Sequence, residues 1–155
     1  MLWVLLGALG VYISESLGLS PVEKGLMVAV PVLTGSLLRV PLGVLGDRVG
    51  GKRVGVPMLA FLFIPLFLGW QMGDSLPMVL GVGLLLGTAG ASFAVALPLA
   101  SRWYSRERQG LVMGIAAAGN SGTVIANLLA PRLADALGWH NVLAVAMVPL
   151  GVVLT

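Results

Sequence analysis

The sequence predicts an all-α membrane protein, and three observations lead to this fold class. Of the 155 residues, 58% are hydrophobic, 22 are glycine and only 10% are charged, a balance typical of proteins that cross a membrane several times. The chain contains six apolar runs that are free of charge or nearly so. Its basic residues gather mainly in two short connectors between these runs, where they set orientation in a membrane. The net charge of +3 therefore does not indicate a nucleic-acid partner.

Each apolar run predicts one transmembrane helix, because about 20 largely apolar residues are needed to cross the hydrocarbon core. The predicted spans cover about residues 1–13, 25–46, 54–70, 76–101, 110–130 and 138–155. The first would reach only about 20 Å at 1.5 Å per residue. The last stops without a tail, so both end spans are expected to be truncated. The second span has a defined start, since Ser20, Pro21 and Glu23 predict a capping box.

The distribution of basic residues predicts the orientation and a location in the cell membrane. Two connectors, residues 47–53 and 102–109, are rich in lysine and arginine and should face the cytoplasm. Enzymatic chemistry is not expected. The chain has no cysteine and a single histidine, so it offers neither thiol chemistry nor a cysteine metal site, and we expect no metal and no cofactor.

Arg39 is the residue that the membrane fold does not explain. It lies eight residues before Asp47, roughly 12 Å along a helix, so it approaches the middle of the bilayer when Asp47 lies at the surface. A guanidinium held there costs about 2.5–3.5 kcal/mol on insertion scales and usually faces a cavity or a partner. No acidic residue lies inside any of the six predicted spans. Arg39 is therefore expected to bind an anion or, alternatively, backbone carbonyl groups.

Two other predicted spans carry polar or aromatic groups at a similar depth. Phe93 and Asn120 both lie roughly 12–15 Å from the cytoplasmic boundary. Asn120, Thr123 and Asn127 form a polar stripe on the fifth span, which either lines a path or hydrogen-bonds to other helices. A second stripe of small residues on this span, which includes Gly114 and Gly122, predicts a packing face. A planar guanidinium binds two oxygens of an oxyanion at once, so this set suits a small delocalised anion.

Several segments resemble a known transporter family. The segment "GVLGDRVGGKR" (residues 43–53) resembles the loop motif between helices two and three of the major facilitator superfamily. The segments "LLRVP" (37–41), "GASFAVALP" (90–98) and "RWYSRERQGLVMGIAAAGNSGT" (102–123) together resemble the nitrate/nitrite porter family of that superfamily. The similarity covers essentially the whole chain.

The resemblance implies that residues 1–155 form the N-terminal six-helix bundle of a facilitator, half of a twelve-helix fold with a 3+3 inverted repeat. It implies membrane transport of nitrate or nitrite by alternating access, with the anion held at the midplane between two halves. By the same resemblance, Arg39 coordinates the anion, Phe93 stacks on it, and Asn120 is the helix-five asparagine. Gly119 and Gly122 flank that asparagine in the family pattern.

The resemblance also implies a gating motif at the cytoplasmic ends of the helices. Its residues are Gly43, Asp47, Arg48, Gly50, Lys52, Arg53, Arg106 and Arg108. Asp47 is expected to join a charge network with Arg48 and the 106–108 connector and so to latch one conformation.

Some alternatives stay open at this point. The partner of the bundle is a missing C-terminal six-helix half or a second copy of the chain. The substrate could be another small solute, such as cyanate, a small carboxylate or a drug, and the chain could instead be a truncated membrane protein that transports nothing. The sequence does not choose between nitrate and nitrite, uptake and export, or proton symport and exchange.

Overall fold

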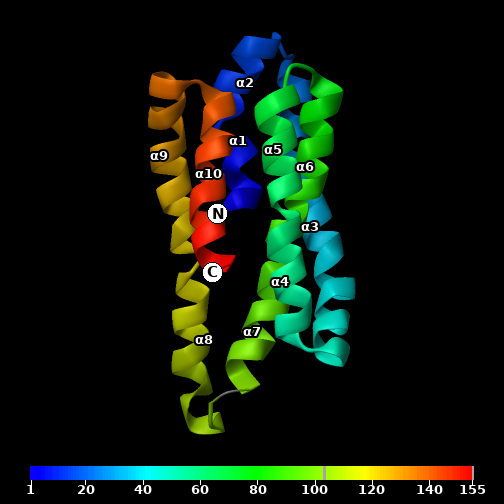
Figure 1. Ribbon diagram of the computed structural model, residues 1–155, viewed down its shortest axis with the longest axis vertical. Coiled ribbons are helices and arrows are strands. Elements are labelled where there is room, and N and C mark those ends of the chain that lie inside the picture. Colours follow the sequence, from blue (N-terminus) through cyan, green and yellow to red (C-terminus); the bar gives the residue numbers. More distant parts are fainter. Residues whose placement is uncertain (103, 155) are drawn as a thin grey trace.

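The computed structural model describes residues 1–102 and 104–154, without the side chain of Arg106, and these residues form an elongated bundle of helices (Figure 1). The elements in chain order are η1 (Leu2–Val4), α1 (Leu5–Ala8), α2 (Gly10–Leu17), α3 (Pro21–Val49), α4 (Gly51–Phe61), α5 (Phe63–Met72), α6 (Leu76–Gly90), α7 (Ser92–Arg102), η2 (Arg106–Arg108), α8 (Gln109–Ala118), α9 (Ser121–Leu137) and α10 (Trp139–Leu154). The all-α prediction is confirmed.

Four helical stretches of the described chain are long and apolar enough to cross a membrane. They are Pro21–Val49, Gly51–Met72, Leu76–Arg102 and Gln109–Leu137. The helices at the two ends, η1 to α2 and α10, are shorter. The count of six spans and the inverted repeat are therefore not confirmed by the described residues. Residue 155, the expected end of the sixth span, lies outside them.

The start of α3 follows the predicted capping box. The Ser20 Oγ accepts a hydrogen bond from the Glu23 backbone N–H at 3.4 Å, and the Glu23 carboxylate accepts one from the Ser20 N–H at 2.8 Å. Pro21 occupies the first turn, where its missing N–H costs nothing. At the other end of α3, Gly50 adopts a φ of 106°, which an L residue rarely adopts, so glycine allows the chain to turn directly into α4.

Three of the four membrane-length stretches are interrupted rather than continuous. The breaks lie at Leu62 between α4 and α5, at Ala91 between α6 and α7, and at Gly119 and Asn120 between α8 and α9. At each break the local hydrogen bonds join residues three apart instead of four, as in the 3.1 Å bond from the Ala91 N–H to the Thr88 carbonyl. Apolar periodicity alone does not reveal these breaks, because hydropathy continues across them.

Glycines bring α3 and α6 into close contact. A Cβ atom on Gly87 would lie 2.6 Å from the Thr34 Cβ and 2.9 Å from the Pro31 carbonyl oxygen, and one on Gly35 would lie 2.8 Å from the Gly87 carbonyl oxygen. Small residues at such positions let two helix backbones approach each other in a membrane. A core of buried residues from most of the helices surrounds this contact; it includes Leu5, Leu9, Ile13, Met27, Leu66, Leu86 and Leu143.

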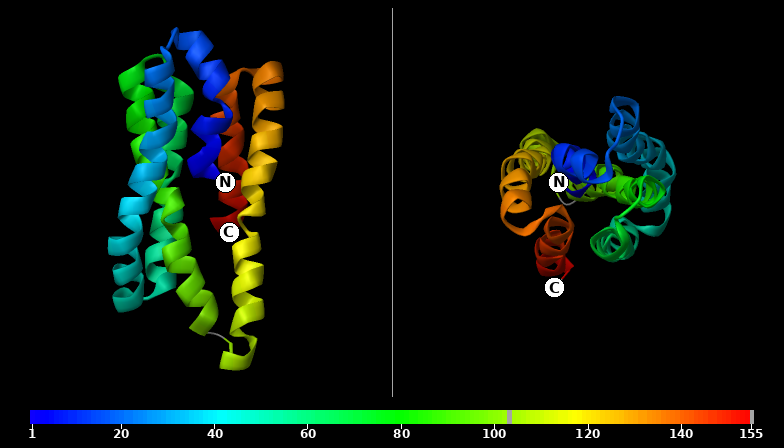
Figure 2. Two further views of the ribbon diagram at one scale, coloured as in Figure 1. Left: turned by 180° about the vertical axis from the view of Figure 1, so that it is seen from behind. Right: turned by 90° about the horizontal axis from the view of Figure 1, so that it is seen from above.

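The helices differ strongly in how much of their surface this chain covers. In Leu76–Arg102, 50% of the most apolar 18-residue segment is buried. The buried share of the corresponding segment is 11% in Pro21–Val49 and 6% in Gln109–Leu137. The chain start lies between the α3–α7 helices and the α8–α10 helices (Figure 2). The two least covered stretches therefore leave most of their apolar surface to lipid or to another polypeptide.

Candidate functional site

Arg39 binds the carbonyl group that the α6–α7 break leaves free. In a continuous helix the Ala94 N–H would donate to the Gly90 carbonyl. Here the Ala94 N–H donates to the Ala91 carbonyl at 3.0 Å, and the Gly90 carbonyl accepts from the Arg39 Nε at 3.3 Å. The break thus supplies an acceptor that anchors the guanidinium across the contact between α3 and α6.

The rest of the Arg39 guanidinium remains available. A guanidinium carries five N–H donors, and the Gly90 carbonyl takes one of them, at Nε. Within the described part of the chain, no ion pair and no further hydrogen bond involves Arg39, and the residue is exposed. The two expectations for Arg39, a carbonyl partner and an anion site, are therefore geometrically compatible. The edge formed by the two terminal nitrogens can bind an oxyanion bidentately.

Trp3 lies beside this anchor and was not singled out from the sequence. A Cβ atom on Gly90 would lie 3.6 Å from the Trp3 ring and 3.3 Å from the Gly35 Cα, so indole and α3 meet at the same glycine. Arg39 follows Gly35 by one helical turn, which places both on one face of α3. The Trp3 Nε1 is buried and has no hydrogen-bond partner among the described residues. Only the fold brings Trp3 to this place.

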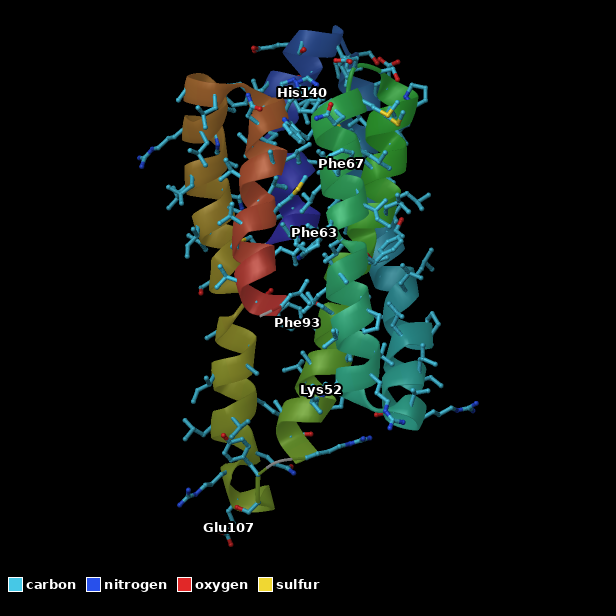
Figure 3. The ribbon with its side chains drawn as sticks, viewed as in Figure 1. Lys52, Phe63, Phe67, Phe93, Glu107 and His140 are labelled. Atoms are coloured by element: carbon cyan, nitrogen blue, oxygen red, sulfur yellow. The ribbon has the colours of Figure 1, made fainter. Side chains whose placement is uncertain are left out.

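Phe93 belongs to the first turn of α7, directly after the break. It is half-buried, and Figure 3 shows it on the side of α7 that faces the α8–α10 helices. Gly90 and Phe93 are three residues apart, so the same break that anchors Arg39 also positions the aromatic ring. The structure therefore places Arg39 and Phe93 at one junction.

The predicted Asn120 site coincides with the α8–α9 break. The Asn120 N–H donates to the Ala117 carbonyl at 2.9 Å, and the Thr123 hydroxyl donates to the Asn120 carbonyl at 2.7 Å. Asn120 and Asn127 are exposed, and neither side chain makes a hydrogen bond within the described chain. The alternative that these amides join neighbouring helices is thus not seen between described residues.

The glycines near Asn120 differ in how closely other residues approach them. A Cβ atom on Gly122 would lie 3.6 Å from the Met1 Cβ, whereas one on Gly114 would have no atom within 4 Å. Gly119 is exposed and ends α8. The packing face expected around Gly114 therefore has no described neighbour at Gly114 itself and stays a prediction; α8 has no buried residues among those described, and it contacts α7.

The start of the chain connects the two breaks. η1 contacts α3, α6 and α9, with Trp3 against Gly90 and Met1 against Gly122. The α6–α7 and α8–α9 junctions lie at similar heights on either side of the N-terminus (Figure 2). No hydrogen bond joins Arg39 to Asn120 between described residues.

The predicted gating motif differs from the expectation in one respect. Asp47 forms its ion pair with Arg102, at 3.0 Å from Oδ1 to Nη2, and not with Arg48 or Arg108. The Arg106 side chain lies outside the described part of the structure. Arg102 was expected only as a residue that sets orientation, although its place at the end of α7 opposite the end of α3 explains the pair. Both side chains are more than half exposed, at 55% and 59%.

The other residues of this motif serve the close approach of helices or remain exposed. A Cβ on Gly43 would lie 3.6 Å from the Ala94 Cβ, which holds α3 against α7. Arg48, Lys52 and Arg53 are exposed at the ends of α3 and α4. In the described chain, no cluster of three or more histidine, aspartate or glutamate residues that could hold a metal ion is found.

Comparison with known proteins gives a consistent result. The family model of the Major Facilitator Superfamily matches residues 1–155. The "Nitrite extrusion protein" of Bacillus subtilis is 37% identical over 98% of this chain, which covers 38% of that protein. The "Probable nitrate transporter NarT" of Staphylococcus epidermidis is 38% identical over 91% of this chain and 36% of its own length. The "Probable nitrate/nitrite antiporter NarK1" of Thermus thermophilus is 37% identical over 84% of this chain and 29% of its own length.

The chain thus spans less than two fifths of the length of these relatives. No solved structure matches the chain.

Proposed function

Because this chain belongs to the major facilitator superfamily, we propose that it forms one half of a carrier that moves nitrate or nitrite across the cell membrane. The names of the relatives support this substrate class. The reaction is translocation by alternating access, in which two bundles rock around an anion held near the midplane. No covalent bond forms or breaks.

The observation that carries this proposal is the partly occupied guanidinium of Arg39. Its Nε is anchored on the Gly90 carbonyl at 3.3 Å, which fixes the direction of the side chain. Its terminal nitrogens have no acidic partner within the described chain, and an uncompensated charge at this depth is costly. A planar anion with two oxygens would satisfy that edge bidentately and neutralise the charge. Chloride would neutralise the charge but has no pair of oxygens to accept two hydrogen bonds from the guanidinium.

The two broken helices support the same place for the site. Carriers of this kind often bind their substrates where membrane helices are discontinuous, because such breaks expose backbone groups that a continuous helix uses internally. The α6–α7 break positions Arg39 and Phe93, and the α8–α9 break positions Asn120 between Gly119 and Gly122. We propose that Phe93 covers one face of the anion and that the Asn120 amide donates to it from the opposite wall.

We infer that a second bundle closes the site. The exposed apolar surfaces of α3 and of α8–α9 fit a second bundle, either a C-terminal six-helix half or a second copy of the chain. With either partner, we propose that residues 1–155 form six membrane spans arranged as a 3+3 inverted repeat. The basic connectors at 47–53 and 102–109 support an orientation in which both face the cytoplasm.

We assign a gating role to the ion pair of Asp47 with Arg102. It joins the cytoplasmic ends of α3 and α7, about one leaflet away from the Arg39 level, and so it can stabilise one conformation without touching the anion. The other motif residues, from Gly43 to Arg53 and at Arg108, would shape and charge the same surface.

A substrate panel tests the proposal. The intact carrier is reconstituted in vesicles, and counterflow is measured with nitrate, nitrite, cyanate, acetate and chloride. The proposal expects nitrate or nitrite to exchange at least tenfold faster than acetate or chloride. Equal rates for all five anions, or transport of acetate alone, would assign the fold to a different solute.

A further inference from the structure

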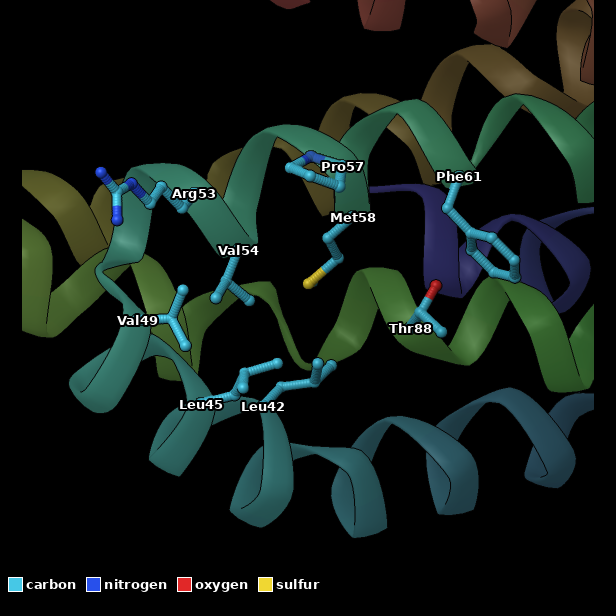
Figure 4. Close-up of a pocket in the computed structure, with 9 residues that line it drawn as sticks. All are labelled: Leu42, Leu45, Val49, Arg53, Val54, Pro57, Met58, Phe61 and Thr88. Carbon is cyan, nitrogen blue, oxygen red and sulfur yellow. The ribbon is translucent and has the colours of Figure 1, made fainter.

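Two apolar grooves run along opposite sides of α4, and each contains one basic residue. The first, of about 410 Å³, lies between α3, α4 and α6, and Arg53 is its charged residue (Figure 4). The second, of about 370 Å³, lies between α4 and α7, and Lys52 is its charged residue. Apart from Thr88 in the first groove and Ser92 in the second, the other lining residues are apolar. We call these two hollows the α4 grooves.

The charge lies at the loop end of each groove. Arg53 and Lys52 belong to the first turn of α4, next to the turn at Gly50, and Figure 4 shows Arg53 at one end of the first groove and Phe61 at the other. Figure 3 shows Lys52 at the same end of α4. Arg53 and Phe61 are eight residues apart, roughly 12 Å along a helix. One leaflet of the hydrocarbon core is about 15 Å thick, so the groove extends through most of one leaflet.

Neither cation has an acidic partner that would compete for it. Within the described part of the chain, no ion pair involves Arg53 or Lys52. The nearest acid along the sequence, Asp47, is already paired with Arg102 at 3.0 Å. The ligand of each groove must therefore combine an apolar tail in the plane of the leaflet with a negative group at its surface.

We propose that the α4 grooves bind anionic phospholipid, with an acyl chain along each groove and the headgroup phosphate at Arg53 or Lys52. Basic residues between transmembrane helices commonly select anionic headgroups in this way. A neutral or zwitterionic lipid would fill the apolar part but would leave the two cations without a net counter-charge. The site is separate from the anion path, since it lies on the α4 side of the bundle and does not include Arg39, Phe93 or Asn120.

The test measures lipid retention on the purified intact carrier. Native mass spectrometry compares dioleoylphosphatidylglycerol with dioleoylphosphatidylcholine, each added to protein in mild detergent. We expect phosphatidylglycerol to be retained preferentially. The variants Arg53→Gln and Lys52→Gln should each weaken its binding about fivefold, which corresponds to the ~1 kcal/mol that a basic residue contributes near an anionic surface.

Arg48→Gln is the matched control. It removes the same charge from the same connector but does not line either groove, so it should leave lipid retention within twofold of the unmodified carrier. Leu45→Trp is the second arm, because it fills the first groove without changing any charge and should also reduce retention. Excess inorganic phosphate should not displace the lipid.

Three results would overturn the proposal. One is equal retention of the two lipids. Another is an equal loss in Arg48→Gln and Arg53→Gln, which would mean that diffuse surface charge is responsible. The third is displacement by phosphate alone, which would mean that no groove for an acyl chain is needed. Because the readout is lipid binding, these outcomes do not depend on whether the carrier moves nitrate.

Discussion

Gly87→Ala tests whether the close contact of α3 and α6 holds Arg39 in place. The added Cβ would lie 2.6 Å from the Thr34 Cβ, 2.9 Å from the Pro31 carbonyl oxygen and 3.0 Å from the Gly35 nitrogen. Carbon atoms in contact lie about 3.5–4.0 Å apart, so the helices must separate by about 1 Å. Two of the three obstructing atoms are backbone, which cannot rotate away. Overpacking of this kind costs about 1–3 kcal/mol of the free energy of unfolding.

The same separation should break the anchor of the guanidinium. The bond from the Arg39 Nε to the Gly90 carbonyl is already long at 3.3 Å, and a further ~1 Å would end it. Gly87→Ala should therefore lower both the unfolding temperature and the affinity for nitrate. The control is Gly81→Ala in the same helix, where a Cβ meets no atom within 4 Å. Thermal unfolding in detergent and nitrate titration measure both effects, and equal behaviour of the two variants would refute the reasoning.

Three further variants test separate parts of the structure. Ser20→Ala removes the acceptor of the Glu23 N–H and should lower the free energy of unfolding by about 1 kcal/mol, measured by thermal unfolding; no loss would mean that the cap contributes nothing. Asp47→Asn breaks the exposed ion pair with Arg102, so the free energy of unfolding should change by less than ~1 kcal/mol. The transport rate should change, whereas the Kd for nitrate should stay within twofold. A loss of affinity alone would contradict a gating role. Asn120→Ala removes one neutral donor and should raise the Kd for nitrate about threefold to tenfold; an unchanged Kd would exclude the amide from the site.

The sequence predicted the helical class and the start of α3 because each depends on local composition or spacing. Charge and hydropathy locate apolar runs, and the Ser20–Glu23 spacing alone specifies a cap. The interruption at Ala91 could not be predicted in this way. Its hydrogen bonds join residues three apart within an uninterrupted apolar run, and its consequence, the bond of the Gly90 carbonyl to Arg39, joins residues that lie 51 positions apart in the chain.

The contacts of the site residues were equally non-local. In the sequence, nothing distinguishes Trp3 from the other residues of the first apolar run. Only the packing of η1 against α6 brings it to Gly90. The ion pair of Asp47 with Arg102 was not predicted, for a similar reason. Neighbours in sequence such as Arg48 lie on a different face of the helix end, whereas Arg102 approaches from α7.

The most direct test of the central claim is the Kd for nitrate of the intact carrier with Arg39→Lys beside the unmodified protein. Lysine keeps the positive charge but loses the planar fork and the Nε that binds the Gly90 carbonyl. Loss of one hydrogen bond to a charged group is worth about 1.5–3 kcal/mol, so the Kd should rise at least tenfold. Arg48→Lys, the same exchange at the exposed end of α3, should leave the Kd unchanged. An Arg39→Lys carrier that binds nitrate as tightly as the unmodified protein would contradict the assignment of Arg39 as the anion-binding residue.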